Sequence, residues 1–280
     1  MLKRNYYYLI AGFPDILVDQ KKLPYPLIEL KQELKYHLHP DDYKLVEYLF
    51  LQYDNTNFLN ILLKKEAEFN PLGNYSEDFF IDEIKEPENL PGYMLKFLEA
   101  YREENPLYPK LSLENQLTWL YFDFMLDQKN PFLRDIFSTI RNVKNIFAVY
   151  NAREFGFDIE NHMIGDYELT EAAKKTTAKD FGLANELSHI DEIIGIHENK
   201  DILEQEISID LLKWKYLNNL NTFNYFTIER ILAYVIEFMI VERWLNLDAE
   251  KSTQIFKKML GELENSIQFS KDFNINEKRR

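Results

Sequence analysis

Residues 227–247 read TIERILAYVIEFMIVERWLNL, and this stretch decides the fold class of the chain. Thr227 is a residue type that commonly caps helices, and apolar residues follow it three and four positions apart. The stretch is also the best candidate for a membrane span, but its five charged residues exclude a lipid-exposed helix. We therefore predict a helix of a globular protein over 227–246. Its apolar positions are Ile228, Ile231, Leu232, Val235, Ile236 and Met239.

The rest of the chain agrees with an all-α fold. All ten prolines lie at or before residue 131, and proline ends or kinks helices, so the second half can form long helices. Glycine is scarce, and no Asn-Gly or Asp-Gly turn joins two alternating apolar runs. The same apolar spacing predicts helices over 27–38, 41–53, 55–69, 92–104, 112–128, 132–155, 168–179, 199–222, 227–246 and 248–266.

Some segments are not predicted to be helical. Residues 70–91, 105–111 and 156–167 contain proline, glycine and polar runs, and we expect irregular structure there. Residues 6–10 (YYYLI) are typical of a strand by propensity and also fit a buried helix. None of the irregular segments resembles a linker, so residues 1–280 are predicted to form a single elongated helical domain.

Composition excludes several classes of function. The chain has 33 Lys and Arg against 47 Asp and Glu, a net charge of −14, which argues against a nucleic-acid partner. It has no cysteine, which excludes disulfides, thiolate metal sites and cysteine nucleophiles. The apolar stretch 6–13 is short and lacks a cleavage site, so we expect no signal peptide, no direct membrane insertion and a cytoplasmic location.

Motifs for catalysis are not found. There is no glycine-rich phosphate loop and no G-x-S-x-G elbow, and the acidic pairs are typical of solvated helix faces. We predict that the chain is not an enzyme and needs no cofactor. Glu186 and His189 form one Glu-x-x-His pair, whereas a di-iron helical bundle needs two such pairs and two further acids. A metal-dependent helical-bundle enzyme therefore remains a minor alternative that depends on these two residues alone.

The aromatic residues Phe223, Tyr225 and Phe226 form another cluster, near Trp214 and Tyr216. A base-stacking platform would need basic residues between the aromatic ones, and none lies within residues 223–226. We expect these side chains to pack in the core.

Two segments of the chain resemble each other. Asp54 and Asn57 lie about one helical turn apart beside an apolar face, and Arg141 and Asn145 repeat the arrangement. A weak internal repeat predicts a fold assembled from similar helical units. We expect these polar residues to bind backbone groups between packed helices, in preference to contacting a partner directly.

These segments resemble the Asp-x-x-Asn repeats of the C-type (also called d-type) central-axis proteins of V/A-type rotary ATPases. The opening NYYYL of residues 5–9 is similar to the start of that family, and ILAYVIE at 231–237, followed by Glu242 and Arg243, is similar to its last helices. The ordered set also resembles an uncharacterised bacterial family that is linked to V-type ATPase genes. The motif positions are Tyr6, Tyr8, Asp54, Asn57, Arg141, Asn145, Leu232, Ala233, Tyr234 and Glu242.

The resemblance implies a fold and a function. It implies three similar helical units, approximately 1–91, 92–180 and 181–280, in a pseudo-threefold, funnel-like arrangement. It implies a non-catalytic central-axis subunit that links the central stalk to the membrane rotor ring and couples rotation to ion transport. The partners would be the proteins of the stalk and the ring, and the complex would hold the chain at the inner membrane. The alternative is an assembly or regulatory adaptor that kept the fold but not the rotor role.

Overall fold

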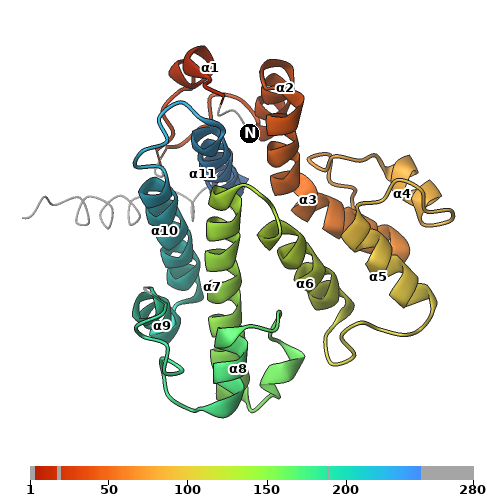
Figure 1. The fold of residues 1–280 in the computed structure, drawn as a ribbon, viewed down its shortest axis with the longest axis vertical. Coiled ribbons are helices and arrows are strands. Elements are labelled where there is room, and N and C mark those ends of the chain that lie inside the picture. The colour runs from red at the N-terminus through yellow and green to blue at the C-terminus, as the bar shows by residue number, and fades with distance from the viewer. Residues whose placement is uncertain (1–3, 18–19, 188, 247–280) are drawn as a thin grey trace, which may run out of the picture.

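The computed structural model describes residues 4–17, 20–187 and 189–246. Over these residues the chain is entirely helical, with eleven α-helices, one 3-10 helix and no strand, which confirms the predicted all-α class (Figure 1). The helices are α1 Tyr7–Ala11, α2 Leu27–His37, α3 Pro40–Leu62, α4 Glu77–Glu83, α5 Gly92–Arg102, α6 Leu113–Leu126, α7 Pro131–Phe155, η1 Ile159–Asn161, α8 Glu168–Lys175, α9 Ile190–Glu198, α10 Ile202–Leu220 and α11 Ile228–Asn246.

Local sequence signals explain where several helices begin. The side chains of Ser112 and Asn130 each accept a hydrogen bond from the backbone N–H three residues further on, in the first turns of α6 and α7. Pro131 then occupies the first position of α7, where its missing N–H costs nothing. Gly156 ends α7 in the left-handed conformation, with φ 72°. The predicted bounds of these two helices are therefore correct to within two residues.

The prediction of two helices over 41–53 and 55–69 is wrong, because a single helix, α3, covers 40–62. Asp54 and Asn57 suggest a break, since such side chains often bind their own backbone. Here both bind a different segment, residues 70–75, so the helix continues past them. Helices α4 and α9 are short and were not predicted, and residues 6–10 belong to α1 and the residue before it. The predicted helix 248–266 lies outside the described residues.

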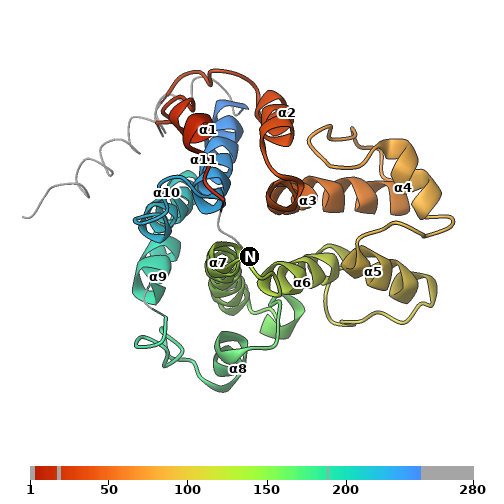
Figure 2. The same cartoon turned by 45° about the horizontal axis from the view of Figure 1, so that its top comes forward.

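Five helices form a closed ring. Each contacts the next in the order α3, α6, α7, α10, α11, and α11 contacts α3 again. Figure 2 shows this arrangement, with α2, α4, α5, α8 and α9 placed outside it. The contact between α11 and α3 joins the two ends of the described chain, so the ring depends on long-range packing.

Several consecutive helices contact each other, among them the three pairs α2–α3, α6–α7 and α10–α11. The second helices of the pairs start at Pro40, Pro131 and Ile228, which are 91 and 97 residues apart. One pair falls in each of the predicted units 1–91, 92–180 and 181–280. The threefold superposition of the units, and the funnel, stay predictions.

Two apolar clusters hold the helices together. The larger one joins α2 to α6, the first half of α7, α10 and α11, and contains Phe50, Phe58, Phe97 and Phe238, all at most 2% exposed. The smaller one joins α7, α8 and α9. Burial of each large aromatic side chain contributes on the order of 2–3 kcal/mol, so the ring is a packed structure with little freedom to deform.

Candidate functional site: the central opening

The ring encloses an opening of about 820 Å³, which is lined by side chains from α3, α6, α7, α10 and α11 and by the loop after α3. Its walls are mostly apolar, as are the walls of most protein cavities that hold a ligand or a partner side chain. The apolar lining includes Leu49, Leu117, Phe122, Phe137, Ile236 and Met239.

The charges around the opening are balanced, although the chain as a whole has a net charge of −14. Three basic residues face three acidic ones: Lys65, Lys213 and Arg243 against Glu114, Asp210 and Glu242. Lys65 Nζ lies 2.9 Å from the carboxylate of Glu114, in an exposed ion pair between the loop after α3 and α6. The opening therefore presents a neutral surface inside an acidic molecule.

Asp210 of α10 is the most buried charged group of the opening, with its side chain 1% exposed. It accepts hydrogen bonds from Lys213 Nζ at 3.0 Å, from Trp244 Nε1 at 2.9 Å and from the Arg243 guanidinium. Burial acts to lower the pKa of Arg243, but the carboxylates of Asp210 and Glu206 outweigh it and raise that pKa. The cluster fastens α10 to the end of α11, because the desolvated carboxylate has all three of its donors on these two helices.

Asp54 and Asn57, on α3, both bind the loop 70–75. Asn57 Nδ2 donates to the carbonyl oxygen of Asn70, and Asn57 Oδ1 accepts from the N–H of Asn70, each at 2.9 Å. The Asp54 carboxylate is fully buried and accepts from the N–H groups of Asn74 and Tyr75, at 2.8 and 3.2 Å. Burial raises the pKa of Asp54, and these N–H donors oppose that rise.

Lys31 of α2 completes the binding of this loop. Its ammonium donates to the carbonyl oxygens of Leu72 and Gly73, both at 2.7 Å, and lies over the Phe50 ring. Burial lowers the pKa of Lys31 to about 8, although Asp54 acts in the opposite direction. Three side chains from α2 and α3 thus hold the loop whose residues Asn70 and Leu72 line the opening.

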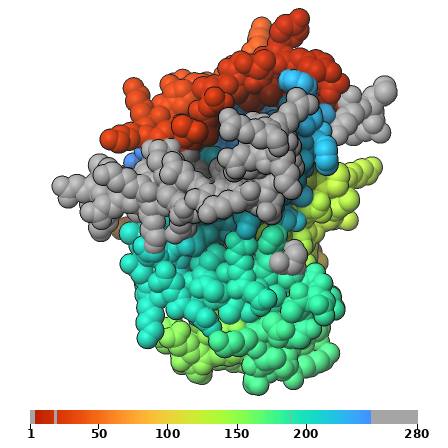
Figure 3. Space-filling model, turned by 90° about the vertical axis from the view of Figure 1, so that its left-hand side faces the viewer, coloured from red at the N-terminus to blue at the C-terminus, as the bar shows by residue number. Residues whose placement is uncertain are grey.

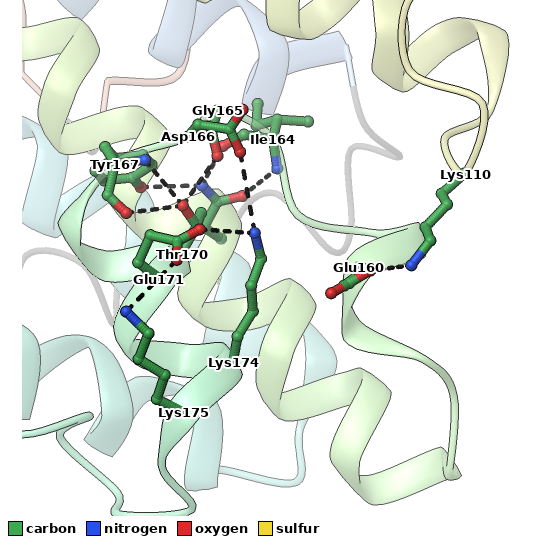
Figure 4. Close-up of polar contacts among 11 residues, drawn as sticks. Lys110, Glu160, Ile164, Gly165, Asp166, Tyr167, Thr170, Glu171, Lys174 and Lys175 are labelled. Carbon is green, nitrogen blue, oxygen red and sulfur yellow. Dashed lines mark hydrogen bonds and ion pairs between the residues drawn. The ribbon is translucent and has the colours of Figure 1, made fainter.

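Asn145 of α7 repeats the device of Asn57. Its Nδ2 donates to the carbonyl oxygen of Ile164 at 2.7 Å, and its Oδ1 accepts from the N–H of Ile164 at 2.9 Å. Figure 4 shows the held loop, residues 164–170, in which Thr170 Oγ1 also donates to the Gly165 carbonyl at 2.9 Å. Arg141 does not bind backbone; its guanidinium stacks on the Tyr167 ring, 3.7 Å from the centroid. Asp54, Asn57 and Asn145 therefore bind backbone groups as expected, whereas Arg141 contacts an aromatic ring.

The remaining motif residues lie elsewhere in the fold. Leu232, Ala233 and Tyr234 are buried on α11, and the Tyr234 hydroxyl donates to the Pro14 carbonyl at 3.0 Å. Glu242 Oε1 accepts from the N–H of Leu27 at 2.9 Å and so caps α2, whose preceding residue is a proline with no capping side chain. Glu242 thereby joins the last described helix to α2, near the start of the chain.

Tyr6 and Tyr8, the two motif tyrosines near the N-terminus, have different surroundings. Tyr6 donates a hydrogen bond from its hydroxyl to Asp42, which ties the N-terminal segment to the start of α3. Burial, followed by the hydrogen bond to the Asp42 carboxylate, raises the pKa of Tyr6. Tyr8 is 96% exposed and lies on the outer surface of α1. The motif residues therefore do not form one site: of the ten, only Glu242 lines the opening.

The expected core packing of Phe223, Tyr225 and Phe226 is wrong, and Phe226 is 39% exposed. All three lie in the turn between α10 and α11, and the side chains of Phe223 and Tyr225 are 86% and 65% exposed. Trp214, in contrast, is buried on α10. An aromatic run in a sequence cannot distinguish a core from an exposed surface, because both give the same apolar pattern.

The sequence reasoning also missed Asp210 and Lys31. Asp210 stands among Ile207, Leu211 and Trp214 on the buried face of α10, and an isolated acid on an apolar face was the signal that could have found it. Lys31 similarly follows Leu30 on the buried face of α2.

Glu186 and His189 do not form a metal site in the structure. His189 lies 3.4 Å from the carboxylate of Glu192 and packs its ring edge against Tyr216. Over the described ranges, no group of three His, Cys, Asp or Glu side chains is arranged to hold a metal ion. Among the helices of the same residues, none is both long and apolar enough to cross a bilayer.

An all-helical ring with a neutral, mostly apolar opening defines the architecture, and comparisons with known proteins add a family. Residues 3–267 match the model of the DUF2764 family, described as a protein of unknown function, and the chain belongs to this family. No curated protein and no solved structure matches the chain.

Proposed function

We propose that the chain is a non-catalytic central-axis subunit of a V/A-type rotary ATPase, which links the central stalk to the membrane rotor ring and couples rotation to ion transport. The observation that supports this most is the closed ring of helices around an opening of about 820 Å³. The order of the motifs at Tyr6, Asp54, Asn145 and Tyr234 also favours it.

The mechanical properties of the ring fit a coupling part. Torque passes through a protein only if its elements do not slide, and close-packed interiors transmit strain. The loops 70–75 and 164–170 are each held by side chains of the long helix that precedes them, so they follow that helix as it moves. The Asp210 cluster and the Glu242–Leu27 contact fasten the last helices in the same way.

The opening would receive side chains of a stalk protein. The opening has room for a few side chains at the tip of a helical partner, but not for a whole helix, whose diameter with side chains is about 10 Å. A neutral, mostly apolar wall favours a partner with an apolar tip, since unpaired charges would lose water without gaining a counter-ion.

The absence of cysteine from the chain allows a direct test. A cysteine introduced at Thr56 or Thr118, both at the opening, is the only thiol and can carry a photo-crosslinker. In membranes that contain the ATPase, we expect crosslinks to a protein of the central stalk. The matched control is Glu99→Cys, at an exposed position of α5 outside the opening, which should give no such product.

If the complex is assembled and neither cysteine at the opening forms a crosslink to a component of the ATPase, the proposal is overturned. Deletion of the gene separates the rotor role from the adaptor alternative. Loss of ATP-driven ion transport in fully assembled complexes supports coupling, and failure of the complex to assemble supports an assembly adaptor.

A further inference from the structure

Five exposed aromatic side chains gather at one end of the molecule, which we name the aromatic end: Tyr7, Tyr8, Phe223, Tyr225 and Phe226. The first two lie on α1 and the others in the turn between α10 and α11. Figure 3 shows these two segments side by side at the top of the view, in red and light blue. Exposed aromatic residues in one place mark an interaction surface more often than isolated ones do.

The aromatic end is held in shape before any partner binds. The N–H of Tyr6 donates to the carbonyl oxygen of Phe226 at 2.7 Å, and the rings of Tyr7 and Phe226 lie 4.7 Å apart. Within the turn, the side-chain amides of Asn221 and Asn224 donate to backbone carbonyls of α10, both at 3.0 Å. Little backbone entropy of these two segments remains to be lost when a partner covers this surface.

Charge distinguishes this end from the rest of the chain. Residues 5–14 and 216–228, which form it, contain no charged residue, while the whole chain has a net charge of −14. Two copies that meet through an acidic face bring like charges into direct contact, whereas two copies that meet here repel each other only through charges that lie further away.

The exposed aromatic area suits a pair of copies. At about 200 Å² per fully exposed aromatic side chain, the five residues present roughly 700 Å². A stable interface of ordinary size buries about 800 Å² on each partner. Flanking atoms of the same turn supply the remainder.

We infer that a second copy of this chain covers the aromatic end of the isolated protein, in a symmetric dimer in which each aromatic end packs against the other. This contact does not depend on the proposed function. It gives the free chain a way to shield a surface that would otherwise be exposed to water.

The test is the mass of the purified full chain, measured by sedimentation and light scattering over a range of concentrations. The variant Tyr8→Ser/Phe223→Ser/Tyr225→Ser removes three exposed rings without touching the core. We expect the unmodified chain to dimerise and this variant to weaken the dimer at least tenfold. A rise in NaCl from about 20 to about 500 mM should strengthen the dimer, because it screens the repulsion between two acidic chains.

The control variant also removes three exposed apolar side chains, but from the opposite end of α7 and α10. Phe155, Phe157 and Ile202 are 60–76% exposed, and Phe155→Ser/Phe157→Ser/Ile202→Ser should leave the dimer unchanged. A monomer at every concentration would overturn the inference, as would a dimer that the aromatic variant does not weaken. A monomer that instead binds vesicles of phosphatidylcholine and phosphatidylglycerol would overturn it in favour of a lipid surface.

Discussion

The side-chain amide of Asn57 binds both the backbone N–H and the backbone carbonyl of Asn70, with two hydrogen bonds of 2.9 Å. Asn145 holds Ile164 in the same way, at 2.7 and 2.9 Å. Each asparagine lies on a long helix, and each held residue lies in the loop that follows that helix. A primary amide carries its donor and its acceptor on two separate atoms, so one asparagine side chain can bind both the N–H and the C=O of a single residue, which suits asparagine to both places.

Removal of either asparagine should destabilise the fold. Asn57→Ala and Asn145→Ala each remove the partner of one N–H and one C=O, at the half-buried Asn70 and the fully buried Ile164, which costs about 2–4 kcal/mol, with the larger loss for Asn145→Ala. Urea unfolding followed by circular dichroism measures this loss. Asn161→Ala, at an exposed position, should change the free energy of unfolding by less than about 0.5 kcal/mol. Equal effects in all three variants would mean that the two loops are not held by these amides.

Gly73 approaches Asp54 so closely that it tolerates no side chain. A Cβ at Gly73 would lie 2.5 Å from Asp54 Oδ1, so Gly73→Ala should cost about 1–3 kcal/mol by displacing the carboxylate or the loop. Gly195→Ala is the matched control, because a Cβ there meets no atom within 4 Å and Gly195 lies inside α9. That control should be neutral or stabilise by up to about 1 kcal/mol. Thermal melting of both variants decides the point, and a neutral Gly73→Ala would contradict the close approach.

Asp210 should be the most sensitive charged position of the opening. Asp210→Ala leaves the Trp244 N–H and the Lys213 and Arg243 cations without their common acceptor, a loss of about 3–5 kcal/mol. The fluorescence of Trp244 should change in the folded variant, because its indole N–H loses a charged neighbour. Glu192→Ala breaks two surface contacts, with Lys215 and with His189, and should cost less than about 1 kcal/mol. Similar losses for the two variants would show that the buried cluster stabilises the fold no more than an exposed ion pair does.

The lowered pKa of Lys31 predicts that the free energy of unfolding depends on pH. Its pKa is about 8 in the folded protein and 10.5 in an ordinary environment, so between these values the unfolded chain holds a proton that the folded chain has released. The free energy of unfolding should therefore rise with pH in this window, by at most about 1.4 kcal/mol per pH unit, and stay flat below it.

The comparison with Lys31→Met isolates this effect. Lys31→Met loses two hydrogen bonds to carbonyls and is expected to be less stable than the unmodified chain throughout. The difference in unfolding free energy between the two proteins should widen from about pH 8 to about pH 9.5, below the range where exposed tyrosines ionise. A constant difference over this range would show that Lys31 keeps its ordinary pKa.

The sequence predicted the helices that have clear ends. Thr227 and the apolar spacing after it located α11, and Ser112 and Pro131 located α6 and α7, because caps and prolines act over a single turn. Helix α9 escaped prediction because it has nine residues, with Gly195 inside it, and its stability comes from packing Ile190 and Ile193 into the second apolar cluster.

The residues that line the opening could not be predicted from local sequence patterns, although most of its helices could. Asp210 meets Arg243 and Trp244 only after α10 and α11 have packed, and no local pattern encodes that meeting. Asp54 misled the prediction for the opposite reason. Its preference for turns holds for an isolated segment, and the hydrogen bonds to Asn74 and Tyr75 override it in the fold.

The contact between Glu242 and Leu27 spans 215 residues, and it has a consequence for synthesis. A ribosome makes about 5–20 residues per second, so α3 waits on the order of ten seconds before α11 exists to cover it. During that delay the nascent chain exposes the apolar side of an unfinished arc. We expect chaperones to protect the nascent chain from aggregation during this time. A chain that terminates before residue 228 lacks α11 and stays dependent on them.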